Sequence, residues 1–440
     1  MARIAVVCPA FFSHLRAFEA LGEQLETLGH HVVFLLPEGT EPMVHKPGFE
    51  VAGVPLPPGY DPEATIRRAA RPRGLPGILR TVGDSAAVTD ALCRHGPAIL
   101  RERGIDAIVA DELEPAGGLL ARHLRLPFAS MAAALPIERD PSMPLPFLGW
   151  SYDPTERGLA RNRGGELVGG LLLGRQRRVI RRWAQHFQLA EIRDDRDCLS
   201  DRLRLAQTVA SFDFPRPADT LLRPVGPIRS TTPSPGQAFG APRQCDRPFV
   251  FASLGTLQGH RFELFRLIAA ACRDLGAELL IAHCGGLDPA QAARLDADHV
   301  VDFADQMAAL RQADICITHG GLNTVLDALA TRTPMLALPI AFDQPGVGAR
   351  IRHHRVGETL PAGRATRAGI RTRLERLLAE HDGFVAAAAP MRGDIARANG
   401  ARNAAVLIDA LVARRSDAVS VPGLAAAPPV GITPHGAALG

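Results

Sequence analysis

The sequence has little lysine and few aromatic residues. Lys46 is the only lysine among the 440 residues, so arginine supplies nearly all of the positive charge, and Phe, Trp and Tyr together make up 5%. The net charge is only +4. Long basic runs with interleaved aromatic side chains, a pattern of nucleic-acid-binding proteins, are absent from the sequence. The composition therefore gives no support for a nucleic-acid partner.

Long apolar runs are also missing. No stretch reaches the roughly eighteen apolar residues of a membrane-spanning helix. Residues 1–12 (MARIAVVCPAFF) contain one early arginine and a short apolar run, which indicates a strand and not a signal peptide. The seven cysteines follow no disulfide or metal-binding spacing, and the histidine pairs at 30–31 and 353–354 lack ligand spacing. We therefore expect a cytoplasmic protein without a metal or other cofactor.

Strand and helix patterns alternate along two halves of the chain. Strands are expected at residues 4–8, 31–36, 107–110, 128–132 and 207–211, and then at 249–254, 279–283, 300–303, 315–317 and 335–340. Helices are expected at 14–28, 166–187, 262–275, 368–380 and 402–415. This alternation favours an α/β fold with parallel sheets, and the length favours two domains. The expected boundaries are an N-terminal domain (1–213), a linker rich in Pro, Ser and Gly (214–247), a C-terminal domain (248–415) and a disordered low-complexity tail (416–440).

The most informative stretch follows the expected strand at 315–317. It reads His319-Gly320-Gly321 and leads into a helical pattern that carries Asn323 and Thr324 in its first turn. Free amides and the helix dipole make a helix N-terminus a binding site for anions. Glycines let the backbone approach a phosphate without a Cβ in the way. The stretch therefore predicts a phosphate site at the end of a strand.

A second strand, at 335–340, ends close to Asp343 and Gln344. The carboxyl ends of parallel strands lie on the same edge of a sheet, where ligands of open α/β sheets bind. A carboxylate and an amide are thus expected beside the phosphate site, where they could bind the hydroxyls of a sugar. Asp327 lies four residues after Asn323, on the same helix face.

The spacing of these motifs resembles the signature of the UDP-dependent glycosyltransferases, the inverting family with the GT-B fold of two facing Rossmann-like domains. The resemblance implies that His319 contacts the diphosphate, that Asn323 and Thr324 hold the α-phosphate, and that Asp327 takes the ribose hydroxyls. The ribose residue of the family is usually Glu, which is one methylene longer. The alternative is a generic Rossmann strand-helix pair with an incidental HGG.

The resemblance also assigns the two ends of the donor. Phe303 and Gln306 would line the uracil pocket, although the stacking residue of the family is often Trp, and Asp343 and Gln344 would bind the sugar. Residues 253–256 (SLGT) resemble a family loop near the donor phosphates, which implies roles for Ser253 and Thr256. A βα turn in which Thr256 caps the helix explains this loop equally well.

A candidate base lies in the first half. His14 follows the strand at 4–8, and Asp111 follows the strand at 107–110, so both are expected at one edge of the sheet. Neutral imidazole can take the proton of an acceptor hydroxyl, and a His base generally needs a partner that fixes its tautomer. The two positions also resemble the catalytic pair of the family. His14 could instead be an ordinary helix residue, and Glu112 or Glu114 could take the place of Asp111.

The acceptor is less evident. Residues 136–150 are apolar and rich in proline, as a wall for a lipophilic acceptor could be. Residues 169–183 place an apolar start beside five arginines, which suggests a peripheral contact with the inner face of a membrane, or else a solvated helix face. The arginines are Arg175, Arg177, Arg178, Arg181 and Arg182.

Residues 9–35 and 338–351 look close to those members of the family that glucosylate hydroxycarotenoids such as zeaxanthin. This resemblance implies UDP-glucose as the donor and a ring hydroxyl of the carotenoid as the acceptor. A glycosyltransferase of macrolides or other aglycones remains an alternative, as does a UDP-sugar 2-epimerase. A binding homologue without catalysis is disfavoured, because both His14 and Asp111 are present.

Overall fold

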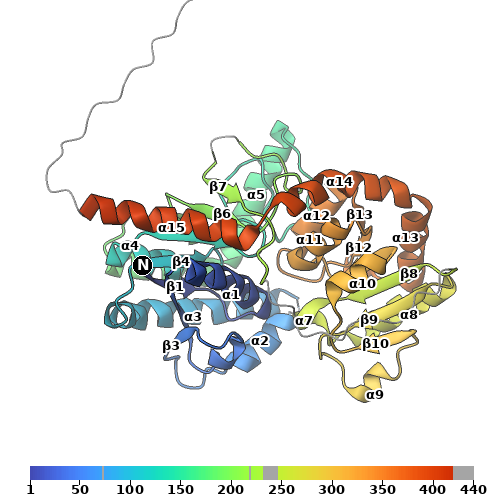
Figure 1. Ribbon diagram of the computed structural model, residues 1–440, viewed down its shortest axis with the longest axis horizontal. Helices are drawn as coiled ribbons and strands as arrows, with labels where there is room; N and C mark the ends of the chain where they lie inside the picture. The colour runs from blue at the N-terminus through green and yellow to red at the C-terminus, as the bar shows by residue number, and fades with distance from the viewer. Residues whose placement is uncertain (72–73, 218–219, 231–245, 420–440) are drawn as a thin grey trace, which may run out of the picture.

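The computed structural model describes residues 1–71, 74–217, 220–230 and 246–419, and they form two α/β domains (Figure 1). The N-terminal sheet has seven parallel strands in the order β3-β2-β1-β4-β5-β6-β7. Their bounds are β1 (Arg3–Val7), β2 (His31–Pro37), β3 (Glu50–Val54), β4 (Ala107–Asp111), β5 (Phe128–Ala132), β6 (Arg204–Ala206) and β7 (Leu222–Pro224). The helices of this half are α1 (Phe12–Thr27), α2 (Pro62–Ala70), α3 (Gly74–Glu102), α4 (Ala116–Leu124), α5 (Glu156–Leu172) and α6 (Gly174–His186).

The strands of this sheet are buried on both faces, which explains their continuous apolar runs. In β1, Ile4 and Val6 pack against α1, while Ala5 and Val7 pack against α3, α4 and α6 on the other face. The strand expected at 207–211 is wrong, because the strand is β6 and ends at Ala206. The side chain of Gln207 is buried and donates a hydrogen bond to the carbonyl of Ala133. The single helix expected at 166–187 is two helices, α5 and α6, which meet at Leu173.

The C-terminal sheet has six parallel strands in the order β10-β9-β8-β11-β12-β13. The strands are β8 (Phe249–Ser253), β9 (Glu278–Ala282), β10 (His299–Val301), β11 (Ile315–Thr318), β12 (Met335–Ala337) and β13 (Gly357–Thr359). The helices are α7 (Gly255–Gln258), α8 (Phe262–Asp274), α9 (Pro289–Ala292), α10 (Gln306–Gln312), α11 (Leu322–Thr331), α12 (Gln344–His353), α13 (Arg367–Ala379), α14 (His381–Arg397) and α15 (Gly400–Val419). Helices α8 and α13 pack on one face of the sheet, and α10, α11, α12 and α14 pack on the other. Two parallel sheets with helices on both faces confirm the predicted fold class.

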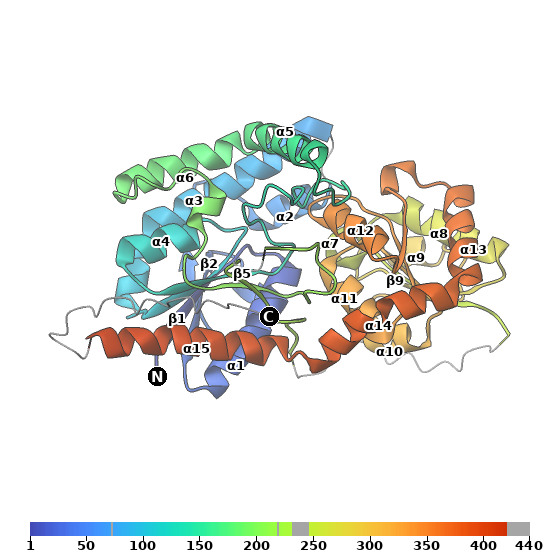
Figure 2. The same ribbon diagram turned by 90° about the horizontal axis from the view of Figure 1, so that it is seen from above.

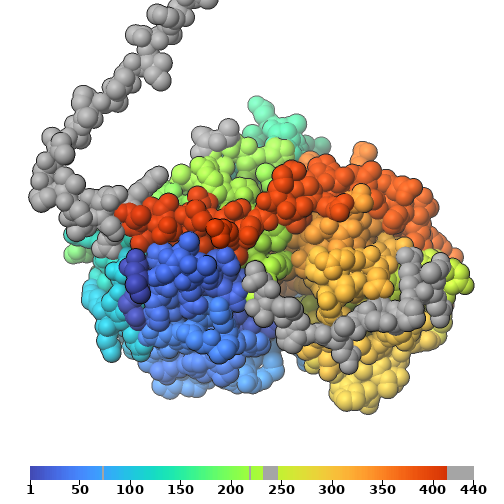
Figure 3. All heavy atoms as spheres, viewed as in Figure 1, coloured from blue at the N-terminus to red at the C-terminus, as the bar shows by residue number. Residues whose placement is uncertain are grey.

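The last helix returns to the first domain. Ala404 and Ile408 of α15 belong to the same buried cluster as Leu15 and Phe18 of α1. Figures 1 and 2 show α15 beside α1 and β1, and in Figure 3 the C-terminal helices form a continuous band over both domains. The expected C-terminal domain included residues 402–415, but the part of α15 up to Leu411 packs on the N-terminal sheet. The helix also extends to Val419, into the expected tail.

Further contacts join the two domains. The buried guanidinium of Arg350 in α12 binds Asp213 at 2.7 Å, and Arg216 binds the other oxygen of the same carboxylate at 2.6 Å. Burial opposes the charge of Asp213, but the two arginines outweigh it and lower its pKa to about 2. The expected linker at 214–247 includes β7, which is a strand of the first sheet. Residues 231–245 of that linker and 420–440 of the expected tail lie outside the described residues.

Candidate active site

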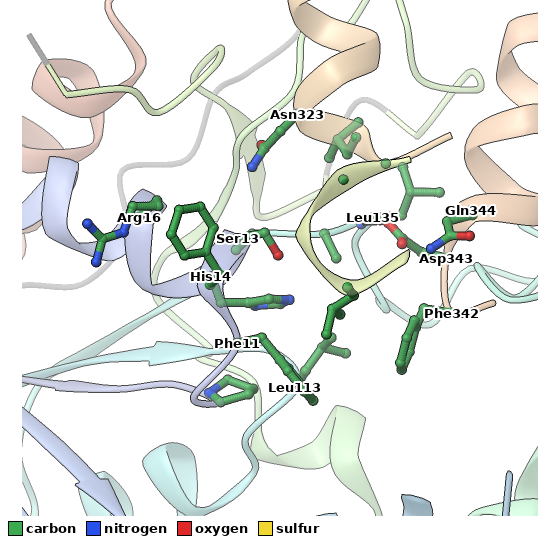
Figure 4. Close-up of a pocket in the computed structure, with 18 of the residues that line it drawn as sticks. Phe11, Ser13, His14, Arg16, Leu113, Leu135, Asn323, Phe342, Asp343 and Gln344 are labelled. Carbon is green, nitrogen blue, oxygen red and sulfur yellow. Dashed lines mark hydrogen bonds between the residues drawn. The ribbon is translucent and has the colours of Figure 1, made fainter. Parts of the chain in front are cut away.

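A cleft of about 2060 Å³ lies between the domains. The loops that line it follow the strands of both sheets, so the carboxyl edges of the two sheets face each other across it. Figure 4 shows His14 of the N-terminal domain opposite Asn323 and Asp343 of the C-terminal domain. This is the position at which ligands bind to open α/β sheets.

The candidate base and its partner are in direct contact. His14, in the first turn of α1, lies with its Nδ1 2.6 Å from Oδ2 of Asp111 at the end of β4, and both residues are buried. The backbone N–H of Leu113 donates to the other carboxylate oxygen at 2.8 Å. Because a carboxylate only accepts, Nδ1 carries the proton, and the lone pair of Nε2 is left for the cleft.

The two neighbouring glutamates have other partners. Glu112 accepts a hydrogen bond from the N–H of Ile137 at 2.9 Å, and Glu114 accepts one from the hydroxyl of Thr89 at 2.7 Å. Burial raises the pKa of Glu112 to about 8 and that of Glu114 to about 7. Only Asp111 of these three carboxyl groups hydrogen-bonds His14, so the geometry separates the alternatives that the sequence left open.

The electrostatics of His14 are set by two carboxylates. Burial lowers the pKa of the imidazole, but the charge of Asp111, the hydrogen bond to it and the charge of Asp343 outweigh burial and raise it. Asp343 comes from the opposite domain, and its carboxylate accepts a hydrogen bond from the N–H of Leu135 at 3.1 Å. Burial raises the pKa of Asp343, against the opposing effects of Leu135 and His14.

Two glycines, Gly321 of the HGG loop and Gly255 after β8, make room for the imidazole of His319. A Cβ at Gly321 would lie 2.5 Å from its Nε2, and a Cβ at Gly255 would lie 2.7 Å from its Cε1. Gly320 adopts φ +83°, in the left-handed region that favours glycine. Nδ1 of His319 is buried without a hydrogen-bond partner, and burial lowers the pKa of the ring to about 4. The ring is therefore neutral and lies at the N-terminus of α11.

Four predicted donor residues form one hydrogen-bonded network. Asp327 accepts from the amide of Gln306 at 2.7 Å, and Gln306 in turn accepts from the hydroxyl of Thr324 at 3.3 Å. The guanidinium of Arg229 donates to Asp327 at 3.2 Å and to the side-chain oxygen of Asn323 at 3.1 Å. The network aligns these side chains along one wall of the cleft.

The loop before α12 is tied in place by Gln344. Its side-chain oxygen accepts hydrogen bonds from the N–H groups of Ile340 and Ala341, at 2.8 and 2.9 Å. Phe342 adopts φ +56°, and its ring lies 6.3 Å from that of Phe11 in the other domain. Gln344 thus shapes the loop with its oxygen, which leaves its amide nitrogen for a ligand.

The remaining predicted donor residues also line the cleft. Phe303 is 46% exposed there, as a residue that stacks on a flat ligand would be before binding. Ser253 ends β8, and its hydroxyl accepts a weak hydrogen bond from the N–H of Gly255 at 3.3 Å. Thr256 lies in the first turn of α7. Twelve of the fourteen predicted catalytic and donor residues therefore line the cleft. The other two are Asp111, which hydrogen-bonds His14, and Gly320, which lies between His319 and Gly321.

Sequence reasoning missed three residues of the site. Arg229 lies in the stretch expected as a linker, Gln207 in an expected strand, and Leu135 in a loop. Gln207 donates to Asn323 at 2.9 Å, so all three reach donor residues from the N-terminal side. None of the three belongs to a local sequence motif. Each joins the site only through a hydrogen bond to a residue of the C-terminal domain.

The structure offers neither a cluster of metal ligands nor a membrane-spanning helix in the part of the chain that it describes. Among the residues that it describes, no group of three or more His, Cys, Asp or Glu side chains could hold a metal ion. Within the same residues, every helix is too short or too polar to cross a bilayer.

The chain resembles known proteins in sequence and structure. A family model described as UDP-glucoronosyl and UDP-glucosyl transferase matches residues 181–383. A zeaxanthin glucosyltransferase of Pantoea ananas is 37% identical over 97% of this chain and 100% of its own length. One of Pseudescherichia vulneris is 42% identical over 81% of this chain and 86% of its own.

Solved structures share the fold at lower identity. The glycosyltransferase of kitacinnamycin has a TM-score of 0.70 at 17% identity, and it covers 93% of this chain and 98% of its own. A calicheamicin glycosyltransferase has a TM-score of 0.67 at 21% identity, with 94% and 99% covered. At these low identities the two structures support the GT-B fold alone. The two zeaxanthin glucosyltransferases, which match most of this chain, show together with the family model that this chain belongs to the family of UDP-glucuronosyl and UDP-glucosyl transferases and is an enzyme that transfers a sugar.

Proposed function

We propose that this enzyme transfers glucose from UDP-glucose to a ring hydroxyl of a hydroxycarotenoid such as zeaxanthin, with inversion at the anomeric carbon. The observation that carries the chemistry is the His14–Asp111 pair, whose free Nε2 opens onto the cleft opposite the donor loops. The acceptor is supported by the two zeaxanthin glucosyltransferases that match most of the chain.

In the proposed reaction His14 is the general base. Its Nε2 takes the proton of the acceptor hydroxyl as the oxygen attacks the anomeric carbon, and the bond from that carbon to the diphosphate breaks on the opposite side. Asp111 stabilises the imidazolium that forms, which agrees with the raised pKa of His14. A single displacement of this kind turns an α-linked donor into a β-glycoside.

The departing UDP carries negative charge, which the donor half would stabilise. The N-terminus of α11 presents free N–H groups and the positive end of the helix dipole. Neutral His319 adds a hydrogen-bond donor without the cost of a second charge. Asn323 and Thr324 would hold the phosphate, Asp327 the ribose, Phe303 and Gln306 the uracil, and Asp343 and Gln344 the glucose. We propose that these groups make a metal ion unnecessary.

The acceptor side of the cleft is mostly apolar. Leu145, Pro146 and Phe147 line it, and they belong to the proline-rich loop at 136–150. Ile78 and Leu172 come from α3 and α5. Apolar walls beside one base suit a lipophilic molecule with a terminal hydroxyl.

The test is transfer by the purified enzyme from UDP-glucose to zeaxanthin held in detergent, followed by chromatography and by the anomeric proton coupling of the product. We expect β-glucosides of zeaxanthin. An α-linkage would contradict inversion, and unchanged zeaxanthin with active transfer to macrolides or flavonoids would favour the aglycone alternative. Release of an epimerised UDP-sugar without any acceptor would identify an epimerase.

A further inference from the structure

Helix α5 has its large and small side chains on the wrong faces for an ordinary surface helix. Its buried positions are Gly158, Asn162, Gly165 and Gly169. Its outer face carries Leu167, Val168 and Leu171, which are 75%, 58% and 80% exposed. A helix at the surface of a water-soluble domain normally buries such side chains.

The small residues hold α5 in this orientation. A Cβ at Gly165 would lie 2.8 Å from the ring of Trp150, and a Cβ at Gly169 would lie 2.9 Å from Leu145. The side chain of Asn162 donates to the carbonyls of Pro141 and Ser142, at 3.1 and 3.0 Å. The helix therefore cannot turn its leucines inward without breaking these contacts, and the leucines stay in solvent.

A second helix extends the apolar surface. Leu75 and Leu79, at the start of α3, are 55% and 37% exposed, and α3 contacts α5. Between them Ile78 lines the cleft, as Gly169 and Leu172 do on α5. We name the five exposed side chains Leu75, Leu79, Leu167, Val168 and Leu171 the entrance patch. Figure 2 shows α5 at the outer edge of the N-terminal domain.

Arginines accompany the patch, but they are only in part the predicted ones. Arg80, Arg163, Arg175 and Arg178 are exposed on α3, α5 and α6. Four of the five predicted arginines have partners within the protein: Arg177 pairs with Asp194, Arg182 pairs with Asp90, and Arg178 and Arg181 donate to the carbonyls of Gly174 and Arg193. The exposed arginines near the entrance patch are thus spread over the three helices α3, α5 and α6.

We propose that the entrance patch docks on a lipid bilayer with anionic head groups, so that the acceptor passes from the membrane into the cleft. Apolar side chains would enter the boundary between head groups and acyl chains, and the exposed arginines would face the anionic lipids. The inference rests on the proposed function, since only a lipophilic acceptor requires this route. Exposed leucines at the cleft mouth with cations around them match a membrane surface in both respects.

The test uses the full chain and vesicles of phosphatidylcholine with phosphatidylglycerol. Leu167→Glu/Leu171→Glu is expected to weaken sedimentation with vesicles at least about tenfold, because two apolar anchors become anions. Arg80→Gln/Arg163→Gln should weaken it less, and only on anionic vesicles. The matched control is Val406→Glu/Leu407→Glu, which changes two exposed side chains of α15, on the opposite side of the sheet from α3 and α6, and should bind as wild type does.

Activity separates this inference from the proposed function. Leu167→Glu/Leu171→Glu should glucosylate zeaxanthin in vesicles more slowly than wild type, yet match it on zeaxanthin in detergent. Wild-type protein that does not sediment with vesicles would overturn the docking inference, and so would a patch variant that sediments normally. A dimer in analytical ultracentrifugation that the patch variant abolishes would also overturn it, because the patch would then be a protein interface. No transfer to zeaxanthin in detergent would instead refute the proposed acceptor.

Discussion

Each domain places a histidine where a loop enters a helix at the cleft, but the two histidines have opposite surroundings. His14 binds a buried carboxylate, which raises its pKa, whereas burial without a charged partner lowers the pKa of His319 to about 4. The first ring can accept and carry a proton, and the second stays neutral. The same side chain in the same kind of position thus suits a base in one domain and an uncharged donor in the other.

The largest expected effect comes from removing the first histidine. His14→Ala should lower the rate of transfer by about 10²–10⁴, because the acceptor hydroxyl loses its base. The affinity for UDP, measured by calorimetry, should stay near the wild-type value, since the donor residues lie in the other domain. Near-normal turnover would remove His14 from the mechanism.

Replacing Asp111, the partner of His14, tests whether its carboxylate raises the pKa of the His14 imidazole. Asp111→Asn should slow transfer at least about tenfold, though less than His14→Ala does. The base works as neutral imidazole, so the rate falls when the pH drops through the raised pKa of His14. Without the Asp111 carboxylate, burial dominates and the acid limb of the pH–rate profile should move to lower pH, with only Asp343 still opposing. An unchanged limb would show that another group titrates.

Substitutions at or beside the second histidine, His319, should weaken binding of the donor instead of slowing proton transfer. Gly321→Ala would push a Cβ against the His319 ring, and His319→Ala would remove the ring. Both should weaken UDP binding roughly tenfold or more, the range for loss of a hydrogen bond to a charged group. Gly383→Ala, a site with open space around the added Cβ, is the matched control. Wild-type affinity in both variants would refute the phosphate site.

Loss of the contact between Arg229 and Asp327 should have a smaller effect on the donor site. Arg229→Gln removes the ion pair with Asp327 and one support of Asn323, and since the pair is partly exposed we expect the KM for UDP-glucose to rise about two- to fivefold. Arg229→Lys should retain part of the effect. Arg371→Gln, which breaks an exposed ion pair with Glu375 on α13, is the control and should change nothing. An equal KM in all three variants would show that the network does not order the donor site.

The smallest expected effect is that of a chelator. If α11 and His319 stabilise the diphosphate by themselves, activity in EDTA should stay within about twofold of that without it. A large loss of activity in EDTA that is reversed by Mg²⁺ or Mn²⁺ would contradict this prediction, since the donor half would then depend on a cation.

The sequence predicted the donor half better than the acceptor half. Ten of the twelve predicted donor residues lie from Phe303 to Gln344, where strand, glycine loop and helix follow one another and local geometry places each element beside the next. His14 and Asp111 are 97 residues apart, and the sequence placed them on one sheet edge without excluding Glu112 or Glu114. The structure decided among these carboxylates because Asp111, the last residue of β4, hydrogen-bonds the ring, whereas Glu112 and Glu114 hydrogen-bond Ile137 and Thr89.

What the sequence by itself determined is therefore the two-domain α/β fold and the position of the HGG loop between β11 and α11, since both depend on local patterns of apolar residues and glycines. The tertiary structure alone decided that Arg229 and Leu135 reach the donor residues, that α15 packs on the N-terminal sheet, and that α5 turns its leucines outward. These features depend on contacts between segments far apart in the chain. Such contacts depend on the shape and charge of both partners, so the local pattern of either segment alone does not specify them.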